Sequence, residues 1–303
     1  MKKVLEVNNV KKKLGKREII KGITFDVNEG EIFGFLGPNG AGKTTTIRML
    51  VDLIHPDSGE IKIFGYNLKK ERTKALENIG AVVENPELYK YLSGRENLMQ
   101  IARVRKLPKE EVERVIEIVG LKDRINDKVK KYSLGMKQRL GLAAALLGEP
   151  KLIILDEPTN GLDPSGIIDF REIVKTAAKE KNMAVFVSSH ILSEVQQLCD
   201  RVAFINNGVI QSVEDMNAEF TTETEVLVLK TTDDDAAVEI VKGISMVKDC
   251  TVRESMINVQ LETGKTPDFI EELVKNNIRI NEIYRKHEQL EQRYMELVEG
   301  GAR

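Results

Sequence analysis

The chain has 303 residues, of which 41% are hydrophobic and 31% charged, and its formal net charge is −2. This length predicts one large domain or two smaller ones, and the apolar content excludes a disordered chain. The balanced charge gives no reason to expect a nucleic-acid partner. The chain has two cysteines, no signal-peptide core and no apolar run of the roughly 18 residues that a membrane span needs, so we expect a cytoplasmic protein.

The first two thirds of the chain alternate between strand-like and helix-like patterns. Residues 4–10 and 19–27 alternate apolar and polar side chains, as half-buried strands do. Residues 31–36, 151–155 and 184–187 form nearly continuous apolar runs, which are typical of strands buried on both faces of a parallel sheet. Strands that alternate with helices predict an α/β layered fold.

A polar segment, residues 217–225, interrupts this pattern, and we interpret it as a linker between domains 1–216 and 226–303. The second domain is expected to contain strand 226–230, helix 236–242, strands 246–253 and 257–261, helix 268–275 and strand 278–284. This βαββαβ order is typical of small α+β domains. An apolar stripe predicts a last helix over 288–298, which serves either core packing or self-association.

A phosphate-binding motif follows one of the buried strands. Gly37 to Thr44 matches G-x-x-x-x-G-K-[ST], and a helix is expected from Thr45 to Leu53. Glycines let backbone N–H groups point at phosphate oxygens, Lys43 adds a cation for the β- and γ-phosphates, and Thr44 offers its hydroxyl to Mg²⁺. The expected phosphate-binding residues are Asn39, Gly40, Ala41, Gly42, Lys43, Thr44 and Thr45.

Two acidic residues, Asp156 and Glu157, follow the apolar run 152–155. Ligands of open α/β sheets bind at the carboxyl ends of strands. There Asp156 can hold Mg²⁺ through water, and Glu157 can orient and deprotonate an attacking water. Alone, the pair is equally a solvated turn, but the phosphate motif favours the catalytic interpretation.

Two further features are ambiguous when taken singly. A Ser-Leu-Gly turn at Ser133 to Gly135 opens an apolar helix, so it is either a helix cap or a second anion site. His190 follows the strand 184–187 and is either a structural residue or a catalytic one.

These motifs, in this order, resemble those of ABC-transporter ATPase subunits. The resemblance covers residues 1 to about 215 and includes Ser133 to Gln138, Gly161 to Asp163 and Ser188 to His190. It implies a P-loop NTPase core with an antiparallel β subdomain and a helical subdomain. Within the superfamily the chain is similar to bacitracin- and lantibiotic-type exporters, which implies antimicrobial or amphipathic peptides as cargo.

The resemblance also implies a mechanism. Two ATP-binding subunits, two copies of this chain or one copy and a homologue, would bind ATP and Mg²⁺ head to tail, with the phosphate loop of one facing Ser133 and Gly135 of the other. Glu157 would act on the water, His190 would contact the γ-phosphate, and Asp163 would communicate across the interface. The ATPase would drive a separate integral membrane permease from the inner face of the cell membrane.

Two positions depart from the family pattern. Glu84 stands where these ATPases usually have Gln, and we expect it to ligate metal or water and to act as the pivot to the permease, although a surface acid in a loop is the alternative. Leu14 stands where an aromatic residue usually stacks on adenine. An aliphatic contact lacks the stacking energy of about 0.5–1.5 kcal/mol, which predicts weaker ATP binding.

Other classes of protein remain as alternatives. A soluble ABC-type ATPase with a non-membrane partner would share the motifs, although this chain lacks a second ATPase unit and long heptad arrays. A P-loop GTPase or small-molecule kinase would leave the Ser-Leu-Gly turn unexplained. A module that binds ATP without turnover is disfavoured by Glu157 but remains open because of Glu84. For the second domain we expect a regulatory or dimer-stabilising role.

Overall fold

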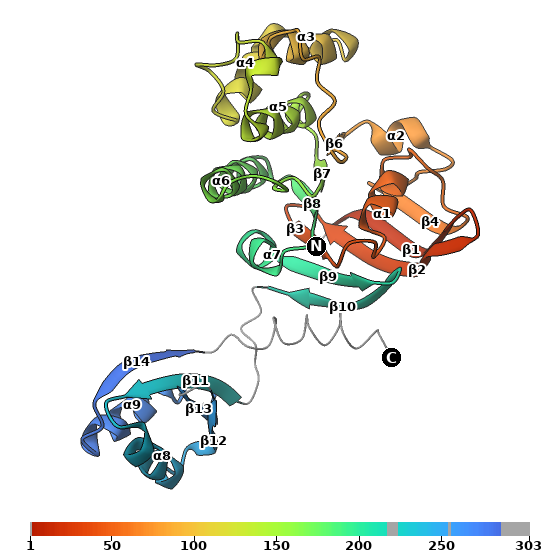
Figure 1. Ribbon diagram of the computed structural model, residues 1–303. Coiled ribbons are helices and arrows are strands. Elements are labelled where there is room, and N and C mark those ends of the chain that lie inside the picture. Colours follow the sequence, from red (N-terminus) through yellow and green to blue (C-terminus); the bar gives the residue numbers. More distant parts are fainter. Residues whose placement is uncertain (1, 217–223, 254–255, 286–303) are drawn as a thin grey trace. The chain divides into compact units, whose positions relative to one another are not determined.

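The computed structural model describes residues 2–216, 224–253 and 256–285, and the chain divides after residue 217 into two compact units, each described here by itself (Figure 1). The first strand of the second unit, β11, begins at Thr224. The expected linker 217–225 therefore overlaps this strand by two residues. Thr224 and Glu225 are polar, which is why the sequence pattern assigns them to the linker, but both pair with the neighbouring strand β13.

The larger unit is built on a six-stranded sheet. Its spatial order is β10 (Val209–Asp215), β9 (Arg201–Asn206), β3 (Ile32–Leu36), β8 (Ala184–Ser189), β7 (Leu152–Asp156) and β6 (Ile79–Val82). All neighbours are parallel except β9 and β10. Every residue of β3, β7 and β8 is buried, as the continuous apolar runs predict for strands covered on both faces.

A second, antiparallel sheet packs beside the first. It consists of β2 (Arg17–Asn28), β1 (Lys3–Leu14), β4 (Ser58–Ile63) and β5 (Tyr66–Asn67), in that order. Phe25 of β2 reaches the aromatic rings of the main sheet, with centroids 5.6 Å from Phe33 and 5.7 Å from Phe186. This stacked cluster joins the two sheets into one core.

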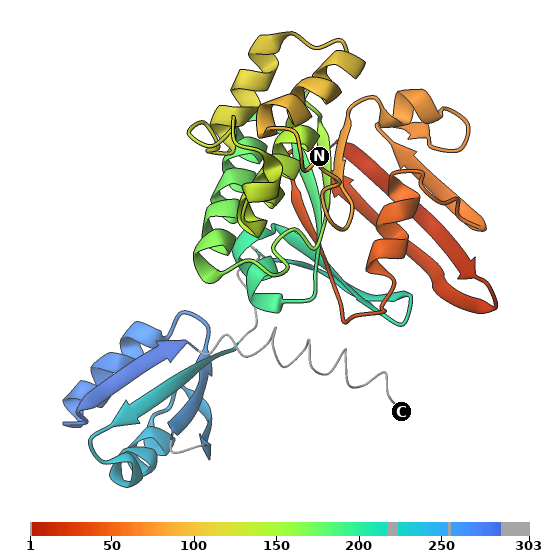
Figure 2. The same ribbon diagram turned by 45° about the horizontal axis from the view of Figure 1, so that its top comes forward.

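The described helices of the larger unit are α1 (Lys43–Leu50), α2 (Arg72–Leu76), α3 (Gly94–Val104), α4 (Lys109–Ile118), α5 (Leu134–Leu146), α6 (Pro164–Lys181) and α7 (Leu192–Leu198), with a 3₁₀ turn over Val129–Lys131. Helices α3, α4 and α5 pack together near β6, and α3–α6 lie on the side of the main sheet opposite the antiparallel strands (Figure 2). Gly80 permits this approach, since a Cβ there would lie 2.0 Å from the Ala145 carbonyl oxygen of α5. The α/β fold with an antiparallel and a helical subdomain is thus confirmed.

A small ion network connects the two sheets. Arg201 of β9 contacts the carboxylates of Glu31 and Asp26, and Lys3 of β1 also pairs with Asp26. Burial alone would raise the pKa of Asp26, but the hydrogen bonds from Lys3 and Arg201 hold that pKa below its usual value.

The smaller unit is a four-stranded antiparallel sheet with two helices. In chain order its elements are β11 (Thr224–Thr231), α8 (Asp234–Gly243), β12 (Val247–Arg253), β13 (Met256–Glu262), α9 (Thr266–Lys275) and β14 (Ile280–Arg285). The strands are arranged as β12-β13-β11-β14, and Leu227, Val259 and Phe269 lie in its apolar core. The βαββαβ order is as predicted, and the expected helix 288–298 lies outside the described residues. In the parts of the chain that the structure describes, the helices are all too short or too polar to span a bilayer.

Candidate active site

Three neighbouring strands of the main sheet end at the same edge. In the parallel registers Leu36 of β3 pairs with Ser189 of β8, and Asp156 of β7 pairs with Ser188 of β8. The phosphate loop, Glu157 and His190 each follow one of these strands directly. The fold therefore brings together three motifs that are far apart in the sequence.

The phosphate loop depends on glycines at the turn into α1. Gly40 and Gly42 have φ values of 81° and 111°, which side chains rarely tolerate. A Cβ on Gly42 would also lie 2.5 Å from Cδ1 of Ile20 in β2. The loop runs through Asn39 and Ala41. Because Gly42 ends it in a left-handed conformation, α1 begins at Lys43 and not at the expected Thr45, so Lys43, Thr44 and Thr45 form its first turn.

Lys43 is buried and points back into the loop. Its side chain is only 4% exposed, and Nζ lies 2.7 Å from the Gly37 carbonyl oxygen and 3.1 Å from that of Pro38. The same Nζ is 3.2 Å from Oε1 of Glu157. The ammonium group is thus held between the loop backbone and the acid that follows β7.

Glu157 connects the three strand ends. Its second carboxylate oxygen, Oε2, lies 3.1 Å from Nδ1 of His190, so the carboxylate bridges Lys43 and His190. Its φ of 44° is uncommon for a residue other than glycine, and its backbone N–H donates to Oγ of Ser188 over 3.0 Å. The side chains of Lys43, Glu157 and His190, which sequence analysis selects as catalytic, therefore lie together.

Asp156 is buried with half of its carboxylate unused. Ser188 donates to Oδ1 over 2.7 Å, whereas Oδ2 is buried and has no hydrogen-bond partner among the described residues. A buried carboxylate oxygen without a partner is costly unless a cation or a donor meets it. In the described part of the chain no three His, Cys, Asp or Glu side chains form a metal cage. This donor set fits Mg²⁺, which is usually bound by one or two carboxylates together with substrate phosphates.

Three predicted residues lie elsewhere in the unit, two as helix caps and one, Gly135, in the first turn of α5. Ser133 caps α5 by accepting from the Met136 N–H over 3.3 Å, and Asp163 caps α6 by accepting from the Gly166 N–H over 3.2 Å. Both residues are exposed. Gly135 lies beside the loop that carries Asp163, since a Cβ on Gly135 would be 3.8 Å from Cδ2 of Leu162.

The two unusual positions, Glu84 and Leu14, are both accessible. Glu84 follows β6 with φ of 59° and forms an ion pair with Arg48 of α1. Its carboxylate therefore contacts a cation on the helix that follows the phosphate loop. Leu14 ends β1 opposite Arg17, and it is 43% exposed.

Sequence reasoning missed three residues that act on this site. Ser188 links Asp156 to Glu157, and only the β7–β8 register could have identified it. Arg48 pairs with Glu84. The third, Glu194 of α7, accepts hydrogen bonds from Thr159 and Ser189, and no sequence pattern pointed to it.

Comparison with known proteins agrees with this geometry. Residues 20–160 match the ABC transporter family model. The chain is 46% identical over 298 residues to the ABC transporter ATP-binding protein YhcH of Bacillus subtilis, covering 98% of this chain and 96% of that protein. It is 40% identical over 303 residues to the bacitracin transport ATP-binding protein BcrA of Bacillus licheniformis, covering 99% of both.

Solved structures match the larger unit. The structure of an ATP-binding subunit of an ABC transporter is 31% identical, with a TM-score of 0.63, and the match covers 70% of this chain and 90% of that one. The matched relatives therefore share the whole chain, and the solved structure shares the part that carries the phosphate loop, Asp156, Glu157 and His190. The chain belongs to the ABC transporter ATP-binding protein family.

Proposed function

We propose that this chain hydrolyses Mg-ATP at the edge formed by β3, β7 and β8 to power a separate permease that exports antimicrobial or amphipathic peptides. The observation that carries the proposal is the convergence of Lys43, Glu157 and His190. The peptide cargo is inferred from the relative named for bacitracin transport, which matches along its whole length.

The phosphate loop and Asp156 account for nucleotide and metal binding. Backbone N–H groups of residues 39–45 and the N-terminus of α1 favour phosphate oxygens. The Thr44 hydroxyl and the unpartnered Oδ2 of Asp156 are the proposed contacts to Mg²⁺, and a bound Mg²⁺ would offset the phosphate charge. Leu14, exposed at the end of β1, is the proposed contact to adenine.

Glu157 is the proposed general base. Lys43 on one side and His190 on the other fix both of its carboxylate oxygens, so its orientation is set before a water is bound. A carboxylate held in this way can accept the proton of an attacking water. With ATP bound, the Lys43 ammonium would stabilise the negative charge that develops on the γ-phosphate, and His190 would contact the same phosphate.

A second ATP-binding subunit, arranged head to tail, would complete the site. Ser133 and Leu134 are exposed at the start of α5, and their hydroxyl and backbone N–H groups form an anion-binding turn. Asp163, which is also exposed, is the proposed contact to the same partner. This arrangement explains why the Ser-Leu-Gly turn is not part of the cluster around Lys43.

The segment after β6 is the proposed contact to the permease. Tyr89 and Tyr91 are 67% and 79% exposed, and exposed aromatic side chains are common in interfaces. Glu84, at the start of this segment, is held by Arg48. We propose that Glu84 exchanges this ion pair for a metal or water contact and is the pivot to the permease, on the cytoplasmic face of the membrane.

Gentle solubilisation of native membranes and purification of the tagged chain test this proposal. A stoichiometric multi-span membrane protein and ATP hydrolysis are expected. Changing both Tyr89 and Tyr91 to Ser should release that protein, whereas changing the exposed Tyr66 of β5 to Ser should not. Recovery of ribosomes or another soluble assembly in place of a membrane protein would favour the alternative, a soluble ABC-type ATPase.

Glu84→Ala separately tests the role of Glu84. If the variant keeps Mg²⁺ dependence, turnover and transport unchanged, the proposed role is wrong. Arg48→Met is the matched control, since it breaks the same ion pair but leaves the carboxylate free to bind metal.

A further inference from the structure

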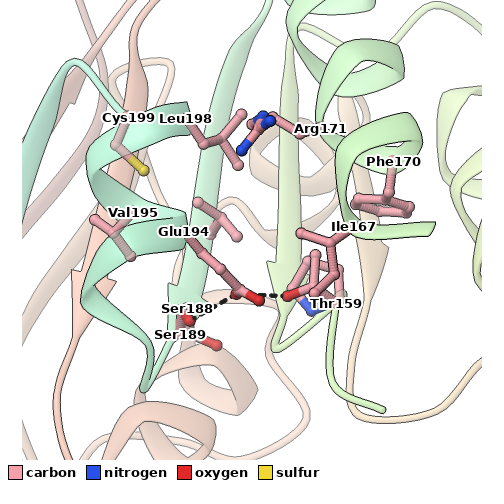
Figure 3. Close-up of a pocket in the computed structure, with 12 residues that line it drawn as sticks. Thr159, Ile167, Phe170, Arg171, Ser188, Ser189, Glu194, Val195, Leu198 and Cys199 are labelled. Carbon is pink, nitrogen blue, oxygen red and sulfur yellow. Dashed lines mark hydrogen bonds between the residues drawn. The ribbon is translucent and has the colours of Figure 1, made fainter. Parts of the chain in front are cut away.

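Glu194 of α7 lies between two catalytic segments without being part of either. Its Oε2 accepts hydrogen bonds from Oγ1 of Thr159 over 2.6 Å and from Oγ of Ser189 over 3.1 Å. Thr159 belongs to the turn after β7, and Ser189 is the last residue of β8. One carboxylate oxygen therefore connects the ends of two strands (Figure 3).

Each hydroxyl belongs to a tight turn that places a catalytic residue. The turn after β7 is closed by the Asn160 N–H, which donates to the Glu157 carbonyl oxygen over 3.1 Å, and by the Leu162 N–H, which donates to the Thr159 carbonyl oxygen over 3.0 Å. Thr159 therefore lies between the proposed base and the loop that carries Asp163.

The turn after β8 is organised in a similar way. Ser189 accepts from the Ile191 N–H over 3.0 Å and donates to Glu194. His190 lies inside this turn, between the two residues that form the bond. The position of His190 thus depends on a hydroxyl that Glu194 holds.

Packing alone does not explain a carboxylate at this position. Glu194 borders a small cavity whose wall includes the apolar side chains of Ile167, Phe170, Val195 and Leu198. Its other oxygen, Oε1, is buried and has no hydrogen-bond partner among the described residues. A charged group with an unsatisfied buried oxygen is unfavourable for stability, so a role in holding the two hydroxyls is the better explanation.

We propose that Glu194 is a positioning residue that keeps the turn after Glu157 and the turn around His190 in one fixed arrangement. Among the described residues Glu194 has no hydrogen bond or ion pair to the phosphate loop, so it acts through Thr159 and Ser189. The inference rests on the proposed ATPase mechanism for its kinetic consequences, but the linkage itself is a property of the folded chain.

Two substitutions at Glu194 separate hydrogen bonding from shape. Glu194→Met keeps the length of the side chain and removes the acceptor, whereas Glu194→Gln keeps an amide oxygen that can accept from both hydroxyls. We expect Glu194→Met to lower kcat about tenfold, with ATP affinity within about twofold of the unmodified chain, because only the transition-state arrangement is disturbed. Glu194→Gln should keep kcat within about threefold.

Two further variants identify the cause. Thr159→Val should reproduce the loss in kcat, and the double variant with Glu194→Met should lose no more than either change alone. Gln197→Met is the matched control, because Gln197 lies on the same helix and accepts a hydrogen bond from Arg171 of α6. Among the described residues it has no hydrogen bond to either catalytic turn. The variant should leave kcat unchanged.

Amide hydrogen exchange tests the linkage without reference to ATPase activity. The amides of Asn160, Leu162 and Ile191 should exchange about tenfold faster in Glu194→Met, but not in Glu194→Gln or Gln197→Met. Unchanged exchange at these three amides in Glu194→Met would overturn the proposal, and so would equal loss of kcat in Gln197→Met. If the unmodified chain lacked ATPase activity, the proposed function would fail, while the exchange measurement would still decide the role of Glu194.

Discussion

Ser188 provides the sharpest test of how the site is assembled, because a single hydroxyl serves both acidic residues. It is fully buried, it donates to Oδ1 of Asp156 over 2.7 Å, and it accepts from the Glu157 N–H over 3.0 Å. Ser188→Ala removes both bonds while hardly changing the volume of the side chain. Neither carboxylate oxygen of Asp156 would then have a hydrogen bond from the described residues, since Oδ2 already has none.

The expected loss follows from these two bonds. A hydrogen bond to a charged group contributes about 1.5–3 kcal/mol, and one between neutral groups contributes about 0.5–1.5 kcal/mol. We therefore expect Ser188→Ala to lower the free energy of unfolding of the larger unit by about 2–4 kcal/mol. For a unit of this size the melting temperature should fall by about 5–15 °C.

Thermal unfolding and steady-state ATPase assays measure the two consequences. The backbone N–H of Glu157 loses its acceptor, so kcat should fall about tenfold, equivalent to about 1.4 kcal/mol in activation free energy. Ser212→Ala is the matched control, because the Ser212 hydroxyl donates to Glu214 over 3.1 Å in the outer strand β10, and its cost should stay within about 0.5 kcal/mol. The same melting temperature and turnover for both variants would refute the reasoning.

Three other changes have defined outcomes. Lys43→Met removes the buried ammonium, so isothermal titration should show ATP affinity reduced about 10–100-fold. Gly80→Ala places a Cβ 2.0 Å from a carbonyl oxygen of α5 and should cost about 1–3 kcal/mol in urea unfolding, whereas Gly243→Ala, where a Cβ meets nothing within 4 Å, should be neutral or stabilising by up to about 1 kcal/mol. The pKa of Asp26 is lowered in the folded chain, so the ionised carboxylate stabilises the fold. This stabilisation is fully present above the pKa of about 3.9 that the carboxyl has in the unfolded chain. It is lost as the pH falls through the lower pKa of the folded chain. Urea unfolding should therefore show a gap between the unmodified chain and Asp26→Asn at pH 7 that closes in acid.

Much of the architecture could be predicted because it follows from local sequence patterns. The continuous apolar runs at 31–36, 151–155 and 184–187 identify strands covered on both faces, and each is followed directly by a motif. Since the carboxyl ends of parallel strands share one edge, the convergence of Lys43, Glu157 and His190 follows from the motifs without the structure. The boundaries of the strands were harder to predict than their existence. Strand β1 continues beyond the expected end at residue 10 through residues 11–14, and these mostly exposed residues are held by pairing with β2 and not by burial.

The contacts that orient the site could not be predicted, because they join residues far apart in the sequence. Ser188 and Asp156 are opposite one another only in the final register of β7 and β8. Glu194 reaches Thr159 across 35 positions of the chain, and nothing in the local pattern around either residue distinguishes a link from a solvated helix face. The motifs thus identify the reacting groups, whereas tertiary structure alone identifies the groups that position them.

Glu84, which stands where the family usually has Gln, shows that the neighbours of an unusual residue matter as much as the residue itself. From the sequence, a carboxylate at this position adds negative charge close to Glu157 and the γ-phosphate. In the structure, Arg48 of α1 pairs with that carboxylate, so the added charge is met by an opposite one. Both partners are about half exposed, and an ion pair in such a setting contributes only about 0–1 kcal/mol. Glu84 can therefore leave Arg48 at little cost, which is what a residue requires if it is to exchange partners between a resting arrangement and one that contacts metal or water.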